Sequence, residues 1–478
     1  MKTIDLSGRP FHFIGIGGIG MSALAHILAK RELPVSGSDL RESHITQRLR
    51  SLGVRIFNGQ EAANLDWFQP RNYSSSQQYR DNLPQVICST AISSKNPEYQ
   101  AATERGYPIF HRSDLLASLI EDYQSIAVAG THGKTTTSSL IGYILFFAGL
   151  DPTIIVGGEV DAWQGNARLG RGNLLVAEAD ESDGSLIKHS PQIGVVTNIE
   201  LDHPDRYQNL EEVVEIFKEF GSQCQTLIGC IDCETVQKEL KPQITYSTDL
   251  NKGADYTVGE IIYHPGGCTA RVWERGKLLG IMRSPLLGEH NLSNALAAIA
   301  VGRLHGLEFE VIAEAIASFE GAKRRFEYRG KSNGITFVDD YAHHPSEIRA
   351  TLAGARLLLN KDSHQRIVAI FQPHRYSRTL TFLQEFGSAF SDADLVVVTD
   401  IYSAGEVNPG TITGNQVAQE ISSHRDRVIY HRAIDSLSSF LAEILQPGDL
   451  ALFLGAGNVN QTIPEVMSIF CSERRKLA

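Results

Sequence analysis

The chain has 478 residues, of which 42% are hydrophobic and 21% charged, and its formal net charge at pH 7 is −11. At roughly 100–200 residues per domain, this length predicts about three domains. The acidic balance argues against a nucleic-acid-binding protein, which needs basic patches. No apolar run approaches the roughly 18 residues of a membrane span, and the first residues show no signal-peptide pattern, so we expect a cytoplasmic protein.

Apolar, strand-like runs alternate with amphipathic, helix-like stretches along almost the whole chain. This alternation is typical of α/β folds with parallel sheets. An apolar strand runs into a glycine-rich turn at three places, residues 11–20, 125–137 and 450–458. We therefore expect three α/β domains, with boundaries at 1–120, 121–322 and 323–478. The polar residues 71–83 are predicted to form a surface loop inserted in the first domain.

The first glycine-rich turn has the spacing G-x-G-x-x-G and lies between a predicted strand and a predicted helix. Its glycines are Gly15, Gly17, Gly18 and Gly20. They let the backbone approach a pyrophosphate, and the helix N-terminus offers free N–H groups. Asp39, at the end of the next predicted strand, stands where an acid would bind a ribose hydroxyl. Taken alone, this motif fits NAD or FAD as well as the diphosphate of a UDP compound.

The second turn, residues 130–137 (GTHGKTTT), resembles the end of a P-loop. The match is partial, because Val128 stands where the full pattern has a glycine. The N–H groups of such a loop wrap phosphate oxygens. Lys134 can neutralise the charge of the β- and γ-phosphates, and the Thr135 hydroxyl can bind Mg²⁺. Since the turn joins an apolar strand to an apolar helix, phosphate binding is the favoured interpretation.

Acidic residues gather where a further predicted strand ends, at Glu178, Asp180, Glu181 and Asp183. Clustered carboxylates repel one another unless a cation neutralises them, and Mg²⁺ suits a site beside a P-loop. A solvated loop would explain Glu181 and Asp183, but it explains Glu178 less well because that residue lies inside an apolar run. His203, after the next predicted strand, is a candidate ligand of a second metal ion, since strand exits line ligand sites in α/β sheets.

Further polar motifs follow along the chain. They are residues 288–294 (GEHNLSN), 323–326 (KRRF), 339–345 (DDYAHHP), 372–379 (QPHRYSRT) and 455–458 (GAGN). Paired arginines recognise carboxylates and phosphates in a bidentate manner. Each motif alone has a structural explanation, such as a helix cap or a solvated basic face, but their joint presence favours an extended active site.

In this order, from about residue 11 to 458, the motifs are similar to those of the Mur ligases of peptidoglycan synthesis. Residues 15–22, 339–347 and 371–379 resemble the branch of that family that adds L-alanine to UDP-N-acetylmuramate. The resemblance implies three α/β domains. A Rossmann-like N-terminal domain would bind the UDP substrate, a central P-loop ATPase-like domain would bind ATP and Mg²⁺, and a Rossmann-like C-terminal domain would bind the amino acid and close over the site.

The resemblance also implies roles for individual residues. Those implied to be catalytic are Lys134, Glu178, His203 and Arg325, and those implied to bind the metal are Thr135, Glu178 and His203. ATP would contact Gly130, Thr131, His132, Gly133, Lys134, Thr135, Thr136, Asn291, Asn294, Arg325 and Asp340. The UDP substrate would contact Gly15, Gly17, Gly18, Gly20 and Asp39, and the amino acid and acyl phosphate would lie near His343, His344, Arg375 and Arg378. Some relatives carry a carbamoylated lysine near the position of Lys218, but the alanine-adding branch is not expected to need one.

The implied reaction joins L-alanine to the carboxylate of UDP-N-acetylmuramate through an acyl phosphate, giving ADP and phosphate. Its partners would be small molecules, with no nucleic acid and no obligate protein partner. Two relatives fit less well: the murein tripeptide ligase differs in the first glycine loop, and folylpolyglutamate synthase has no reason to carry that loop. A nicotinamide oxidoreductase would leave the P-loop unexplained, and a P-loop switch protein would leave the motifs of the third domain unexplained.

Overall fold

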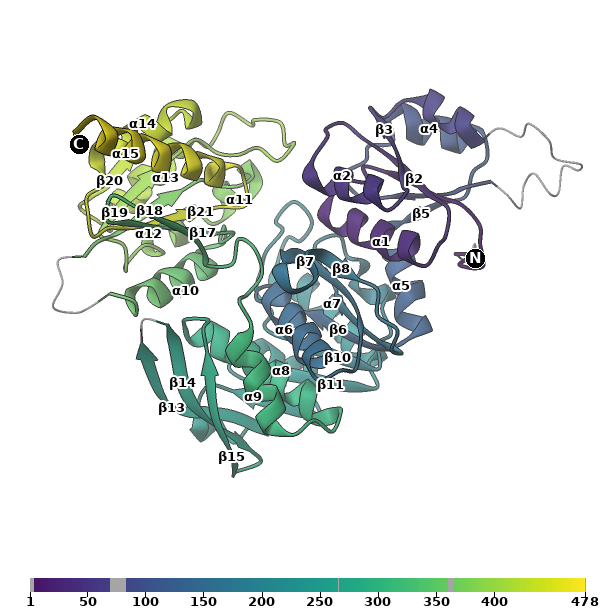
Figure 1. Ribbon diagram of the computed structural model, residues 1–478, viewed down its shortest axis with the longest axis horizontal. Helices are drawn as coiled ribbons and strands as arrows, with labels where there is room; N and C mark the ends of the chain where they lie inside the picture. Colours follow the sequence, from purple (N-terminus) through teal and green to yellow (C-terminus); the bar gives the residue numbers. More distant parts are fainter. Residues whose placement is uncertain (1–3, 69–82, 265, 360–364, 478) are drawn as a thin grey trace, which may run out of the picture.

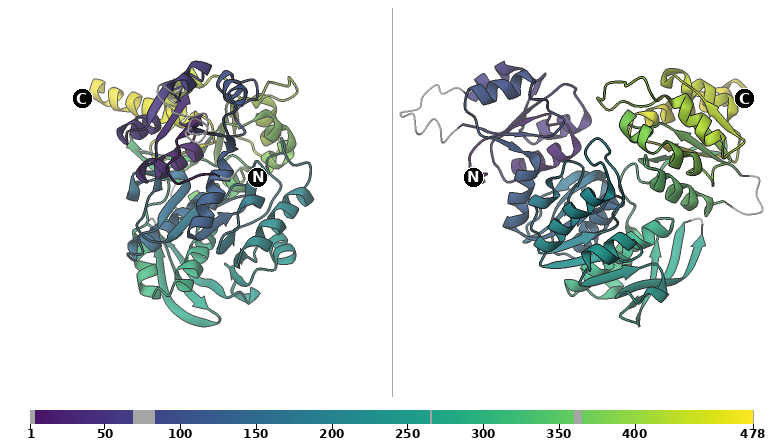
Figure 2. Two further views of the ribbon diagram at one scale, coloured as in Figure 1. Left: turned by 90° about the vertical axis from the view of Figure 1, so that its right-hand side faces the viewer. Right: turned by 180° about the vertical axis from the view of Figure 1, so that it is seen from behind.

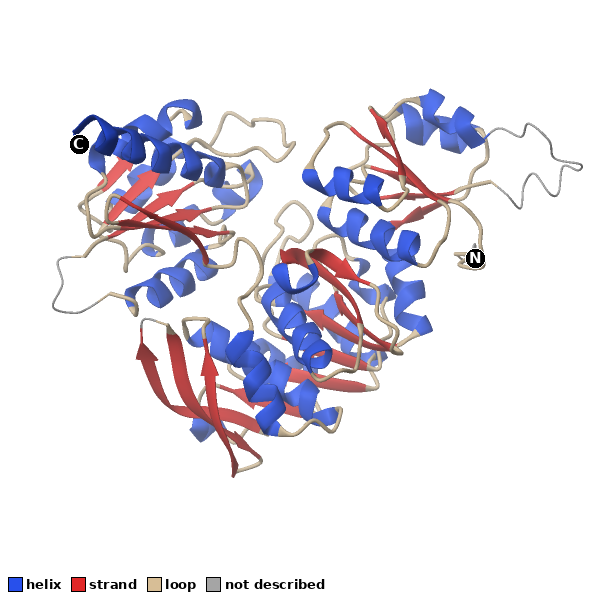
Figure 3. Cartoon of the chain, viewed as in Figure 1, coloured by secondary structure: helices blue, strands red, loops and turns tan. Residues whose placement is uncertain are grey.

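The computed structural model of the protein describes residues 4–68, 83–264, 266–359 and 365–477. Most of the predicted insertion, residues 71–82, lies outside this part. The chain forms three α/β units, each built on its own sheet (Figures 1 and 3), as expected from the sequence. The N-terminal and C-terminal units both lie against the central unit, and the view from behind shows the same arrangement (Figure 2).

The N-terminal unit is a five-stranded parallel sheet with strand order β3-β2-β1-β4-β5. Its elements are β1 (Phe11–Ile14), α1 (Ile19–Lys30), β2 (Val35–Asp39), α2 (His44–Ser51), β3 (Arg55–Asn58), η1 (Ala62–Phe68), β4 (Gln85–Cys88), α4 (Pro97–Glu104), β5 (Ile109–His111) and α5 (Arg112–Asp122). All four residues of β1 are buried, because helices cover both faces of a parallel sheet. The turn from β1 to α1 carries the first glycine motif, as in Rossmann folds.

The central unit is a ten-stranded mixed sheet with strand order β15-β14-β13-β12-β11-β10-β6-β9-β7-β8. Its first half contains β6 (Gln124–Ala129), α6 (Lys134–Phe147), β7 (Thr153–Val160), η2 (Asp161–Trp163), β8 (Gly165–Arg168), β9 (Leu174–Glu178), η3 (Ser185–Lys188), β10 (Ile193–Val196) and α7 (Leu210–Gln223). Its second half contains β11 (Thr226–Cys230), η4 (Val236–Leu240), β12 (Ile244–Ser247), η5 (Leu250–Lys252), β13 (Tyr256–His264), β14 (Gly267–Glu274), β15 (Lys277–Ser284), α8 (Glu289–Leu304) and α9 (Phe309–Ser318). Within the sheet, the neighbouring strands β13, β12, β11, β10, β6, β9 and β7 pair in parallel. Strand β8 at one edge, and β14 and β15 at the other, are antiparallel to their neighbours.

The C-terminal unit is a six-stranded sheet with strand order β16-β17-β21-β18-β19-β20, in which only the β16–β17 pair is antiparallel. It contains β16 (Glu327–Ser332), β17 (Ile335–Asp340), α10 (Pro345–Arg356), β18 (Ile367–Phe371), α11 (Tyr376–Thr381), α12 (Leu383–Ser388), β19 (Leu395–Val398) and α13 (Gly414–Ser422). It ends with β20 (Val428–Tyr430), η6 (Ile434–Ser436), α14 (Leu437–Ile444), β21 (Leu450–Leu454), η7 (Val459–Thr462) and α15 (Ile463–Leu477). No helix in the described parts of the chain has both the length and the apolar character needed to cross a membrane.

Helix α1 belongs to the core of the N-terminal unit and also packs on the central sheet. Its buried Leu24 and Ile27 share one apolar cluster with Ile155 of β7 and Leu175 of β9. The Asn166 side chain on β8 donates a hydrogen bond of 2.5 Å to the carbonyl of Ile19 in the first turn of α1. The first glycine turn is therefore held at a fixed place relative to the central sheet.

Candidate active site

The phosphate loop between β6 and α6 has two positions whose backbone conformation and surroundings allow only glycine. Gly130 has φ +135°, and an added Cβ would stand 2.0 Å from the Thr197 hydroxyl oxygen. Gly133 has φ +82°, and an added Cβ would stand 2.7 Å from the side-chain oxygen of Asn294. Asn294 is itself buried and accepts a hydrogen bond of 3.0 Å from Thr137 on α6. In this structure Asn294 therefore supports the loop from helix α8.

Lys134, the first residue of α6, turns back over this loop. Its ammonium donates to the carbonyls of Gly130 (2.6 Å) and Thr131 (3.1 Å) and to both carboxylate oxygens of Glu181 (2.9 Å each). Burial opposes the charged form, but Glu181 and Asp180 outweigh it and raise the pKa of Lys134. Lys134 is thus a fixed cation beside the N-terminus of a helix, which suits the binding of a phosphate chain.

The interpretation of Glu181 and Asp183 as part of a solvated loop is wrong. The side chains are only 2% and 4% exposed, and both are ion-paired, Glu181 with Lys134 and Asp183 with Arg112. A carboxylate can be buried when it has a cation as partner, and the sequence does not show which cations lie nearby.

Glu178 lies at the end of β9 and faces the first turn of α6. Its carboxylate accepts hydrogen bonds from the Thr135 hydroxyl (3.1 Å) and from the N–H of Gly157 (2.7 Å). Arg325, from the segment that leads into the C-terminal unit, donates to the same Thr135 hydroxyl at 3.4 Å. Thr135, Glu178 and Arg325, which sequence reasoning placed together, therefore meet at one point.

His203 lies in a second cluster, together with Asp180 and Glu181. One ligand atom from each of these three side chains lies within 4.8 Å of the others. The structure thus divides the predicted metal ligands into two places, Thr135 with Glu178 and His203 with two carboxylates. Hydroxyl and carboxylate oxygens are the ligands that Mg²⁺ prefers, so Thr135 with Glu178 fits that ion; at the second place two carboxylates fit it, whereas the His203 nitrogen is a donor more typical of transition metals.

A cavity of about 240 Å³ opens beside the phosphate loop, between the central and C-terminal units. Residues of both units line it, among them Thr136, Asn291, Arg325 and Asp340. Asp340, at the end of β17, accepts hydrogen bonds of 2.7 Å from the N–H groups of Phe326 and Ala342. Burial raises the pKa of Asp340 to about 6, although Arg325 opposes this rise. Asn291, Arg325 and Asp340, all predicted to bind ATP, thus share one cavity.

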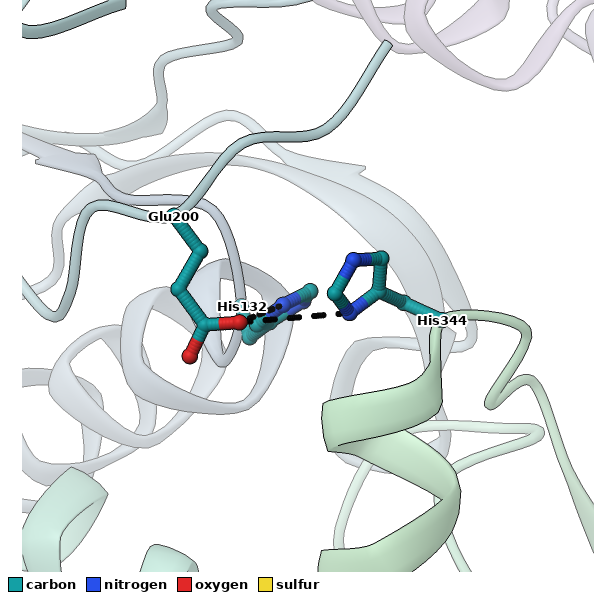
Figure 4. Close-up of side chains that lie close together, drawn as sticks. All are labelled: His132, Glu200 and His344. Atoms are coloured by element: carbon teal, nitrogen blue, oxygen red, sulfur yellow. Dashed lines mark ion pairs between the residues drawn. The ribbon is translucent and has the colours of Figure 1, made fainter. Parts of the chain in front are cut away.

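His132 of the phosphate loop forms a polar contact between the two units. Its ring lies 3.5 Å from Glu200 of the central unit and 3.3 Å from Glu347 of helix α10. Figure 4 shows His132, Glu200 and His344 facing one another, with the two rings 4.7 Å apart. Burial opposes protonation of His132, but the two carboxylates outweigh it and raise its pKa to about 10. The two carboxylates therefore favour the imidazolium form of His132, although neither ring nitrogen reaches hydrogen-bond geometry with them.

Glu347 also organises the segment that carries the two predicted amino-acid-site histidines. Its carboxylate accepts hydrogen bonds from the N–H groups of His343 (3.0 Å) and His344 (3.2 Å), and it caps the N-terminus of α10. Pro345 is the first residue of this helix, a position where its missing N–H costs nothing. Sequence reasoning missed Glu347, although a glutamate at the third position of a predicted helix is a recognisable capping signal.

The two arginines predicted near the amino acid are both paired with aspartates of the central unit. Arg378, which is 2% exposed, binds Asp202 through two hydrogen bonds of 2.9 and 3.1 Å. Arg375 lies 2.7 Å from Asp205. Burial would raise the pKa of Asp202, but Arg378 outweighs it and holds this pKa well below its usual range. Both arginines thus tie the C-terminal unit to the segment that carries His203.

The first glycine loop lies at the other side of the central unit. Asp39 accepts a hydrogen bond of 2.8 Å from the N–H of Gly17, so it stabilises the loop itself in this structure. Gly15 has φ +79°, whereas Gly18 precedes α1 with an extended backbone and is exposed. Lys218 is on the surface of α7, paired with Glu215 at 3.1 Å and Glu239 at 2.7 Å, and it does not join these sites.

Nucleotide-type turns in all three units, with a phosphate loop and an acidic strand end at their centre, define a multidomain nucleotide-dependent enzyme. Three family models match the chain in the same order: "Mur ligase family, catalytic domain" over residues 10–124, "Mur ligase middle domain" over 128–302, and "Mur ligase, glutamate ligase domain" over 324–457. The chain belongs to the Mur ligase family.

Individual relatives are similar over nearly the full length of the chain. The UDP-N-acetylmuramate–L-alanine ligase of Gloeothece citriformis is 65% identical and covers 98% of this chain, which in turn covers 99% of that protein. The enzyme of the same name from Microcystis aeruginosa is 66% identical, with 98% of each chain covered.

Among solved structures, the UDP-N-acetylmuramate–alanine ligase of Thermotoga maritima is similar, with a TM-score of 0.80 and 28% identity over 97% of this chain and 99% of that one. The murein peptide ligase of Psychrobacter arcticus has a TM-score of 0.69 at 22% identity, over 97% of this chain and 99% of that one, and shows the fold alone.

The buried Lys134–Glu181 pair generates a stability prediction. Lys134→Ala leaves Glu181 as an unpaired carboxylate that is 2% exposed, so the free energy of unfolding should fall by about 3 kcal/mol at pH 8. Burial raises the pKa of Glu181. An unpaired Glu181 therefore destabilises the fold at high pH, and this penalty should shrink as the pH falls toward 5 and the carboxyl takes up a proton. Urea unfolding of the variant and of wild type between pH 5 and 8 measures this penalty.

The matched control is the double variant Lys134→Ala/Glu181→Gln, which removes both charges. It should recover most of the lost stability and lose the pH dependence that Lys134→Ala shows relative to wild type. A double variant no more stable than Lys134→Ala would show that the buried charge of Glu181 is not the cause.

The imidazolium of His132 generates a second, pH-dependent prediction. Its pKa is about 10 in the folded chain against an ordinary value of 6.5, so its stabilisation is complete below pH 6.5 and is lost as the pH rises toward 10. His132→Gln should therefore cost the most stability near pH 6 and progressively less at pH 8 and 10. The urea midpoints of wild type and His132→Gln at pH 6, 8 and 10 test this prediction. A difference in midpoint that stays the same at all three pH values would refute the interdomain ion pair.

Proposed function

We propose that this enzyme uses ATP to join L-alanine to the carboxylate of UDP-N-acetylmuramate in the cytoplasm, giving ADP and phosphate. The observation that carries the proposal is the 59–66% identity, over 98% of the chain, to relatives that bear the name of this activity. The reaction is a step of peptidoglycan synthesis and serves cell shape and division. It needs two substrates beside ATP, and the fold offers a separate unit for each of the three molecules.

The three predicted domains divide the work in this proposal. Residues 1–120 bind the UDP part of the sugar substrate at Gly15, Gly17, Gly18 and Gly20. Residues 121–322 bind the phosphates of ATP, and residues 323–478 bind the amino acid and cover the nucleotide. The common cavity of Asn291, Arg325 and Asp340 supports an adenosine site between the second and third domains.

In the first step, the sugar carboxylate attacks the γ-phosphate of ATP, the bond from that phosphate to ADP breaks, and an acyl phosphate forms. Lys134 and Arg325 neutralise charge on the transferred group and align it, since phosphoryl transfer depends mostly on electrostatics and positioning. Thr135 and Glu178 at one place, and His203 with Asp180 and Glu181 at the other, would hold Mg²⁺. The ion would supply charge neutralisation at the phosphates.

In the second step, the amine of L-alanine attacks the acyl carbonyl, phosphate leaves, and the amine loses a proton as the amide forms. We place His343, His344, Arg375 and Arg378 near this reaction. They lie on the edge of the C-terminal unit that faces His203, as the pairs of Arg375 and Arg378 with Asp205 and Asp202 support. Closure of the C-terminal unit over this place would exclude water, which would otherwise hydrolyse the acyl phosphate.

A ligation assay tests the proposed function. The purified chain with ATP and Mg²⁺ should release phosphate only when UDP-N-acetylmuramate and L-alanine are both present, and mass spectrometry should find their amide. Replacing L-alanine by the murein tripeptide L-alanyl-γ-D-glutamyl-meso-diaminopimelate tests the related activity. Faster turnover with that tripeptide than with L-alanine would overturn the proposal in favour of the recycling ligase.

Arg325 provides a test of the first chemical step. It contacts Thr135 across the domain boundary, and its charge meets negative charge that builds on the transferred phosphoryl group. Arg325→Ala should lower kcat by about 100-fold or more, with a smaller change in the KM for the UDP-sugar. Arg329→Ala, which removes a partly exposed arginine of β16 paired with Asp339, is the control and should keep near-normal kcat. Equal kcat values for the two variants would contradict the assigned role.

A further inference from the structure

Arg112 begins helix α5 in the N-terminal unit, and its guanidinium lies against the acidic strand end of the central unit. Its Nη2 atom donates to the carboxylate oxygens of Asp180 and Asp183, each at 3.0 Å. Asp183 is 4% exposed and Arg112 20%. Since Asp180 belongs to the same cluster as His203, Arg112 links the N-terminal unit directly to the candidate catalytic centre.

The other side of the guanidinium lies beside the first glycine loop. The Nη1 atom of Arg112 is 3.6 Å from the place that a Cβ on Gly20 would occupy. Gly20 is in the first turn of α1, where backbone N–H groups have no helical partner. Gly18 and Ile19, which precede it, are exposed, so the loop is open on the side from which a ligand would reach it.

The guanidinium has donors left over for a ligand. Among the described residues, neither Nη1 nor Nε of Arg112 has a hydrogen-bond partner, because both hydrogen bonds of the guanidinium use Nη2. His111, the neighbouring residue, has a buried Nε2 atom 3.6 Å from Asp183 that also lacks a hydrogen-bond partner. Unused polar groups on the inner face of two domains indicate a site that a polar ligand completes.

The charge of Arg112 is shared between Asp180, Asp183 and any ligand that its Nη1 atom reaches. A diphosphate carries about two negative charges, whereas a helix N-terminus offers only about half a positive charge. A guanidinium holds its charge and its N–H groups in one fixed plane, which the flexible ammonium of a lysine does not. The glycine loop alone therefore leaves a diphosphate underneutralised, and Arg112 is placed to supply the missing cation.

We propose that Arg112 binds a phosphate of the UDP diphosphate through the two N–H groups of Nη1 while Nη2 stays on Asp180 and Asp183. This rests on the proposed function, and it adds a substrate-binding residue from outside the glycine motif. The same guanidinium then touches the diphosphate and the acidic strand end. Binding of the diphosphate thereby fixes the distance between the sugar and the phosphate loop, which aligns the sugar carboxylate for attack.

Isothermal calorimetry with UDP, which has the diphosphate but neither sugar nor carboxylate, tests this role without catalysis. Arg112→Ala should weaken UDP binding by about 10- to 100-fold, the loss expected for charge-assisted hydrogen bonds. Arg112→Lys keeps the charge but loses the fixed, planar placement of Nη1, and its affinity for UDP should fall between those of wild type and Arg112→Ala. Binding of a non-hydrolysable ATP analogue should change by less than about threefold in both variants, a difference below 1 kcal/mol.

Asp183→Asn is the matched control, because it breaks one of the interdomain ion pairs but keeps the guanidinium. It should bind UDP as tightly as wild type or more tightly, since the freed guanidinium loses a competing anion. If Asp183→Asn weakened UDP binding as much as Arg112→Ala, Arg112 would act only by joining the domains, and the inference would be wrong.

The outcomes separate this inference from the proposed function. UDP binding that is normal in wild type and in both Arg112 variants refutes the role of Arg112 and leaves the ligase activity standing. A wild-type chain that binds no UDP refutes both. Circular dichroism checks that each variant is folded. If Arg112→Ala unfolds, Arg112→Lys is compared with Asp183→Asn, because only the lysine variant should lose affinity for UDP.

Discussion

The parallel register of three neighbouring strands, β9, β6 and β10, holds the candidate active site together. Val128 of β6 pairs with Glu178 of β9, and Ala129 pairs with Val196 of β10. All three strands therefore end at the same edge of the sheet, as in other open α/β folds that bind ligands there. The phosphate loop, the acidic cluster and the segment with His203 each begin at this edge, so a shift of one strand would separate them.

Charged pairs join both outer units to this centre, with Arg112 pairing with Asp180 and Asp183 on the N-terminal side, but the N-terminal unit also shares an apolar cluster with the central sheet. Helix α1 is buried against β7, β8 and β9 through apolar side chains, which hold the first glycine loop firmly. The C-terminal unit is joined mainly by charged pairs, including those of Arg378 with Asp202 and His132 with Glu347. Exposed charged pairs, such as that of Arg375 with Asp205, weaken with salt, whereas apolar packing does not. The interface of the C-terminal unit is thus the one suited to opening for substrates.

Sequence reasoning predicted the α/β class and the place of each polar motif, because glycine turns and apolar strands are local patterns. It also placed Thr135, Glu178 and Arg325 together through family resemblance. It could not identify Glu181 as the buried partner of Lys134, or Asp202 as that of Arg378, because such pairs join segments that are 47 and 176 residues apart. The solvated-loop interpretation of Glu181 failed for this reason, since burial depends on what packs above a segment.

The sequence by itself determined which segments can bind phosphate, because Gly130 and Gly133 adopt positive φ values that side chains disfavour. It also determined where helices begin, as Pro345 does for α10. Only the tertiary structure decided which charges neutralise one another. Arg112 has no motif around it, yet it lies between Gly20 and Asp180, because the start of α5 and the segment after β9 meet where the N-terminal and central units pack together. Such contacts depend on the docking of whole units, which no local pattern specifies.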